Sequence, residues 1–143
     1  MDVANVMGSR PDGWWRDRAG AAVRLHADLA QLAASGQPVL PPDPDSAPHP
    51  DSDSAPHPAP APPEFVMVLE GAARAAAGRI EPAERVRVVV ADGSGDDAIV
   101  ALLRELSGRR VVVTADRELR RRSAAAGASA QGPGWLLSQL PAR

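Results

Sequence analysis

Acidic residues mark the ends of apolar, strand-like segments in this chain of 143 residues. The six are Asp2, Glu70, Asp92, Asp96, Asp97 and Asp116. Carboxylates gathered in one cleft repel one another, so they must take up protons or a cation. Oxygen ligands without His or Cys suit Mg²⁺ or Mn²⁺, and such an ion activates water and bridges a phosphate oxygen. The pattern therefore predicts a metal-dependent phosphodiesterase site.

Two other interpretations of these carboxylates remain open. Ser94 and Asp97 have the spacing of a helix capping box, and Asp116 is a candidate N-cap. Capping is compatible with metal binding, because a carboxylate has a second oxygen. Residues 93–98 also fit the dinucleotide-binding pattern G-x-G-x-x-A after a strand. We favour this reading least, because two aspartates in the first helical turn would repel a pyrophosphate.

The elements that must position these groups follow from apolar spacing. It predicts strands at 1–7, 65–69, 85–90, 110–114 and near 128, and helices at 16–35, 71–78, 96–106, 116–126 and 134–140. Alternating strands and helices indicate a parallel sheet with helices on both faces. We therefore expect a three-layer α/β/α sandwich with a mostly parallel central sheet of four to five strands. Its carboxyl-terminal edge would gather the acidic residues.

Residues 37–63 interrupt this pattern. They hold eleven of the 15 prolines and repeat the sequence Asp-Ser-Ala-Pro-His-Pro at 45–50 and 53–58. Proline fixes φ and removes a donor, which predicts a disordered, extended loop. We thus expect one domain over residues 1–143 with this loop as an insertion. His49 and His57 could bind a metal, but we favour a linker that grew by repetition, in which the two histidines have no role. The loop could also be a ligand for a proline-binding partner.

Charge and composition narrow the function classes. All 16 basic residues are arginine, which suits bidentate phosphate contacts but also reflects a GC-rich genome. The chain has no cysteine, which excludes a disulfide scaffold and a thiolate zinc site. Its apolar runs are too short to cross a bilayer, and no secretory signal opens it. We expect a soluble, cytoplasmic protein.

Candidate substrate contacts are basic or hydroxyl residues near the predicted acidic edge. They are Arg10, Arg16, Thr114 and Arg117. Trp14 and Trp15 either stack on bases, as in proteins that bind single strands, or pack the first helix against the sheet.

Three segments resemble the PIN-like superfamily. They read Asp-Val-Ala-Asn-Val (2–6), Gly-Asp-Asp-Ala-Ile (95–99) and Val-Val-Thr-Ala-Asp-Arg-Glu-Leu (112–119). The sequence Gly-Ser-Arg-Pro-Asp-Gly-Trp-Trp-Arg-Asp (8–17) is similar to that of small bacterial NYN and YacP-type proteins. The resemblance implies an α/β/α fold and a ribonuclease activity that depends on Mg²⁺ or Mn²⁺.

The resemblance also implies residue roles. Catalytic residues would be Asp2, Asn5, Asp96, Asp97 and Asp116, and the four aspartates would hold the metal. Asn5 would orient a carboxylate or the water. Glu70 lies where some members place another acid, and Thr114 would bond a carboxylate or a phosphate.

One departure from the family concerns the first strand. Only Met1 precedes Asp2, so either the chain's start has been set too late or this central strand is shortened. A shortened strand would lose ladder bonds and core contacts. Two alternatives to an RNA-cleaving enzyme therefore stay open: a nucleoside triphosphate pyrophosphohydrolase, and a catalytically decayed module that binds RNA or protein. A homodimer is also possible.

Overall fold

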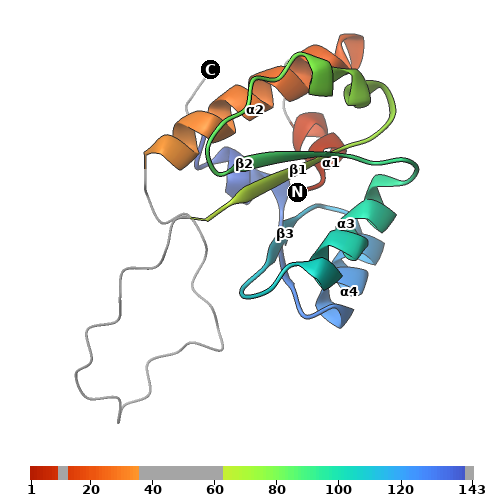
Figure 1. The fold of residues 1–143 in the computed structure, drawn as a ribbon. Coiled ribbons are helices and arrows are strands. Elements are labelled where there is room, and N and C mark those ends of the chain that lie inside the picture. The colour runs from red at the N-terminus through yellow and green to blue at the C-terminus, as the bar shows by residue number, and fades with distance from the viewer. Residues whose placement is uncertain (10–12, 36–62, 141–143) are drawn as a thin grey trace, which may run out of the picture.

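The computed structural model describes residues 1–9, 13–35 and 63–140 (Figure 1). Its elements, in chain order, are α1 (Val3–Gly8), η1 (Trp14–Arg16), α2 (Arg18–Ala34), β1 (Phe65–Leu69), η3 (Gly71–Gly78), β2 (Val86–Val90), α3 (Gly95–Glu105), β3 (Val111–Val113), α4 (Arg117–Ala125), β4 (Ser129–Gln131) and α5 (Pro133–Leu137). The predicted insertion and its two histidines lie outside the described residues, so that prediction stays untested. No helix within the described ranges is both long and apolar enough to span a membrane.

Most predicted elements are confirmed to within a few residues. The continuous apolar runs form β1, β2 and β3, and the segments with helical spacing form α2, α3 and α4. The alanine-rich segment 71–78 is a 3₁₀ helix that begins at Gly71, whose φ of 57° favours glycine.

The prediction of one central sheet of four to five strands is wrong. The described residues form two parallel two-stranded sheets, β1–β2 and β3–β4. Between them lies only the start of the chain. Asp2 forms an isolated parallel bridge with Val68, and its N–H donates to the carbonyl of Val113 at 3.0 Å. Two residues make too few ladder bonds to join the sheets into one.

The predicted first strand over residues 1–7 is instead helix α1. Val3, Val6 and Met7 are buried, and their spacing of three and four residues matches a helix. Asp2 caps this helix, because its carboxylate accepts from the N–H of Asn5. The helical period and the cap therefore prevail over the apolar composition that predicted a strand.

Two hydrophobic clusters hold the elements in place. The larger packs α1 and α2 against β1 and includes Leu25, Leu29 and Met67. The smaller lies under α3 and α4 and includes Ile99 and Leu119. Figure 1 shows α2 crossing one side of the β1–β2 sheet, with α3 and α4 side by side on the other. Together, the clusters fix the strand ends and helix starts that carry the acidic residues.

Candidate carboxylate site at the strand ends

Asp2 lies at the centre of a buried hydrogen-bond network and is only 6% exposed. Its Oδ2 accepts from the Asn5 side-chain amide at 2.7 Å and from the Thr114 hydroxyl at 2.9 Å. The side-chain Oδ1 of Asn5 in turn accepts from the backbone N–H of Ala115 at 3.0 Å. The network fixes the Asp2 carboxylate between α1 and the end of β3 and leaves Oδ1 with one long hydrogen bond, 3.3 Å from the Asn5 N–H.

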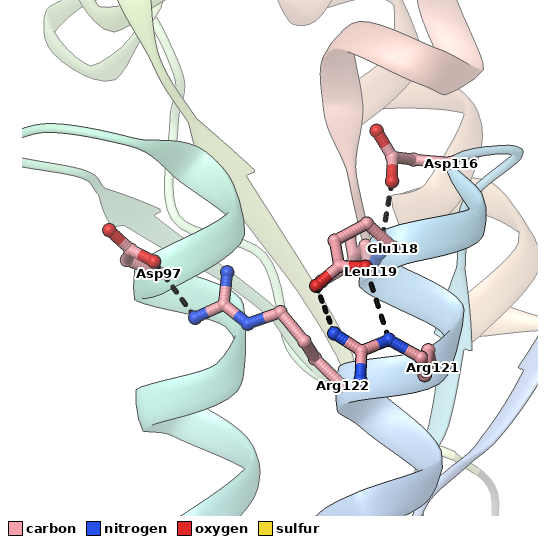
Figure 2. Close-up of polar contacts among 6 residues, drawn as sticks. All are labelled: Asp97, Asp116, Glu118, Leu119, Arg121 and Arg122. Carbon is pink, nitrogen blue, oxygen red and sulfur yellow. Dashed lines mark hydrogen bonds and ion pairs between the residues drawn. The ribbon is translucent and has the colours of Figure 1, made fainter.

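Thr114 connects this network to Asp116. The fully buried hydroxyl accepts from the Asp116 N–H at 3.1 Å while it donates to Asp2. Asp116 caps α4, because its Oδ1 accepts from the Leu119 N–H at 2.9 Å (Figure 2). The predicted N-cap is thus confirmed, and its second oxygen is left for other contacts. The resemblance implied that Thr114 bonds a carboxylate or a phosphate, and in the structure its hydroxyl donates to the Asp2 carboxylate.

Glu70 holds the start of α3. Its Oε2 accepts from the Gly95 N–H at 2.6 Å. A methyl group at Gly95 would lie 2.8 Å from the Glu70 carboxyl carbon, so only glycine permits this approach. The predicted capping box is not formed, because the Ser94 side chain makes no capping hydrogen bond. Glu70, which follows a different strand, takes that place.

Asp96 is the residue on which these carboxylates converge. Partial burial raises its pKa above the ordinary 3.8, and the nearby charges of Asp2, Asp116 and Glu70 raise it further. Arg122 acts weakly in the opposite direction. The charges of Asp2, Asp116 and Glu70 thus act on Asp96, although the single sheet edge that was predicted to gather them is not formed and Asp2 lies at the start of a helix.

Asp97 lies apart from this group. Its carboxylate accepts from the Arg122 guanidinium at 2.8 Å, and its side chain is 72% exposed. Figure 2 shows Arg122 reaching across from α4 to α3, away from the cap at Asp116. Asp97 is also absent from the charges that raise the Asp96 pKa. Asp96 and Asp97, which have the same predicted role, are therefore in different surroundings. Asp96 lies in the acidic region, and Asp97 forms an ion pair between α3 and α4.

The remaining predicted contacts are dispersed. Arg10 lies outside the described residues. Arg16 stacks on the exposed Trp15, 5.8 Å from the ring centre. Arg117 is the first, exposed residue of α4, beside Asp116, and Asp92 is exposed after β2. Of the three predicted substrate contacts that the structure describes, only Thr114 is bonded directly to the site.

The donor set suits a small hard cation with few protein ligands. Among the described residues, no group of three or more acidic or histidine side chains could hold an ion by itself. Mg²⁺ commonly uses one or two carboxylates and completes its shell with water and phosphate oxygens. Asp96 and the less engaged oxygens of Asp2 and Asp116 offer that chemistry. These residues fit an ion that binds together with a phosphate.

Comparison with known proteins gave no matching family model, no matching curated protein and no matching solved structure. The resemblance to the PIN-like superfamily therefore stays a prediction, and the site must be interpreted from its own geometry.

Proposed function

We propose that this protein is a metal-dependent phosphodiester hydrolase that acts on RNA, in the manner that its resemblance to PIN-like and NYN proteins suggests. The carrying observation is the hydrogen-bond network that joins Asp2 to Asn5, Thr114 and Asp116. Burial and then the charges of Asp2, Asp116 and Glu70 raise the pKa of Asp96. Repulsion between carboxylates is relieved by a proton or a divalent cation.

The residues of the site would divide the work. One or two of Asp96, Asp2 and Asp116 would hold Mg²⁺ or Mn²⁺ together with water and a substrate phosphate oxygen, and the ion when bound would polarise a phosphoryl oxygen and lower the pKa of water. Asn5 and Thr114 hold the Asp2 carboxylate in one orientation through bonds of 2.7 and 2.9 Å. Glu70 holds the start of α3, and with it the neighbouring Asp96.

Metal-dependent cleavage of RNA tests the proposal with matched variants. Asp96→Asn and Asp116→Asn keep the shape of each side chain, and asparagine also caps helices well. We expect each to lower Mn²⁺-dependent cleavage by at least about tenfold, since each removes a charge that would face the ion. Asp97→Asn is the control, because its carboxylate is exposed and paired with Arg122.

Two outcomes would overturn the proposal. One is RNA cleavage that is unchanged in both Asp96→Asn and Asp116→Asn. The other is release of pyrophosphate from nucleoside triphosphates with RNA left intact. Isothermal titration with Mn²⁺ adds a readout independent of activity: heat of binding should be present in the wild type and Asp97→Asn, and reduced in Asp96→Asn.

A further inference from the structure

A cavity of about 340 Å³ lies beside the carboxylate site. Its apolar wall includes Val3 and Met7 of α1, and its polar wall includes Trp14, Arg18 and Glu70. A volume of this size lies within the range of small-molecule pockets, which combine apolar walls with a few polar groups. It therefore has the size and chemistry for a small planar ligand.

Trp14 and Arg18 form a stacked pair in the wall of this cavity. The Arg18 guanidinium carbon lies over the Trp14 ring, 5.4 Å from its centre, which is within cation–π distance. Nucleobases stack on arginine planes as well as on aromatic rings. By contrast, Trp15 and Arg16 make a similar pair at 5.8 Å, but neither lines this cavity.

Glu70 belongs to both the cavity and the acidic region. It lines the cavity, and its charge is one of those that raise the Asp96 pKa. One of its oxygens accepts from Gly95, and the other can accept from the N–H groups of a base. A nucleotide whose phosphate lay at Asp96 would thus have its base next to this cavity.

From this continuity we propose that the cavity is a nucleobase subsite in which the base stacks on Arg18, backed by Trp14, and bonds to Glu70. This inference rests on the proposed phosphodiesterase function, which it extends from the phosphate to the base. Binding of the base to this subsite does not require a metal ion, because the base contacts only protein side chains there.

Nuclear magnetic resonance of the full chain tests the subsite without catalysis. The indole N–H signals of Trp14, Trp15 and Trp135 report separately on the cavity, a neighbouring exposed ring and a distant site. Titration with adenosine, which carries the base without a phosphate, in EDTA should shift the Trp14 signal saturably and leave the Trp135 signal unmoved. Ribose, which lacks the base, should bind at least about fivefold more weakly. An unmoved Trp14 signal, or equal binding of the two compounds, would refute the subsite.

A blocking variant gives a second, independent measurement. Gly93 lines the cavity, and a Cβ added there meets nothing within 4 Å, so Gly93→Leu should fold and place a bulky side chain in the cavity wall. Gly78→Leu is the matched control, because Gly78 is equally open but does not line the cavity. We expect Gly93→Leu to weaken adenosine binding at least about fivefold and Gly78→Leu to leave it unchanged.

The two proposals fail in different ways. Binding of adenosine without any RNA cleavage would support the subsite and refute the nuclease. RNA cleavage by a protein whose affinity for adenosine is unaffected by Gly93→Leu would refute the subsite and support the nuclease.

Discussion

The buried α-amino group of Met1 should make folding stability depend on pH. Its nitrogen donates to the carbonyl of Val66 at 2.6 Å in the space between β1 and β3. Burial lowers the pKa of this amine from 8.0 to about 6, against a smaller opposing effect of Asp2. The unfolded chain therefore binds more protons between these two pH values, so stability rises as pH rises through the window and is lost as pH falls.

The magnitude follows from the size of the shift. A change of about two pKa units corresponds to roughly 2.7 kcal/mol between the limits of low and high pH. Between pH 6 and pH 8.5, linkage gives a gain of about 2 kcal/mol in the free energy of unfolding. Urea denaturation at several pH values measures this gain directly.

Two variants with four residues added before Met1 test the charge of the amine and the space around it separately. Placing Ser-Gly-Ser-Gly before Met1 replaces the amine by a neutral peptide N–H, which can still donate to Val66. The free energy of unfolding of this extended chain should lack the pH dependence that the amine contributes. Contributions from other ionisable groups cancel when the extended chain is compared with the wild type. If wild type and extended chain respond to pH identically, the amine is not buried as described.

An apolar extension, Val-Val-Ile-Val, tests the space itself. The cavity between the sheets has a volume of about 250 Å³ and is lined by residues of β1, α3 and β3. An extended segment there would pair with both strands and bury roughly two side chains, worth about 2–4 kcal/mol. At pH 8.5 this chain should therefore unfold at higher urea than the Ser-Gly chain. Equal midpoints at that pH would show that the two sheets do not accept a strand between them.

Three further predictions concern single side chains, each measured by urea denaturation. Gly95→Ala should destabilise the fold by about 0.5–1.5 kcal/mol, because the new methyl group would displace the Glu70 carboxylate that accepts from the Gly95 N–H, whereas Gly93→Ala, with open space around it, should change stability by less than about 0.5 kcal/mol. Asp116→Ala should cost about 0.5–2 kcal/mol through loss of the α4 cap, and Asp116→Asn should retain most of it; equal losses in the two variants would contradict the capping role. His26 is buried with Nε2 unpartnered among the described residues, and burial lowers its pKa below the ordinary 6.5, so wild type should lose stability relative to His26→Leu as pH falls below about 6.5, while a constant difference would argue against a buried neutral imidazole.

Local patterns predicted the separate elements well. The apolar runs of β1 and β3 and the three-and-four spacing of α2 and α3 each contain their own signal, since burial on a strand or a helix face depends on neighbouring residues. Residues 1–7 are mostly apolar, which is typical of a strand, but Val3, Val6 and Met7 also have the spacing of one helix face, and the Asp2 cap favours the helix. The division into two sheets could not be read locally, because it depends on how many residues of one segment reach between two others.

The acidic region shows the same division between sequence and structure. The sequence by itself determined only that acidic residues follow β1, β2 and β3; the single sheet edge that was expected to gather them does not form, and Asp2 lies at the start of α1. Only the tertiary structure separated Asp96 from Asp97, since adjacent helical positions point about 100° apart and Arg122 of α4 takes the outer one. Likewise, only the tertiary structure brings Glu70 to the N–H of Gly95 and places Glu70, Trp14 and Arg18 in the wall of one cavity. The bonds of Glu70 to Gly95 and of Arg122 to Asp97 each join residues 25 positions apart in the sequence, and no local pattern of residue types encodes them.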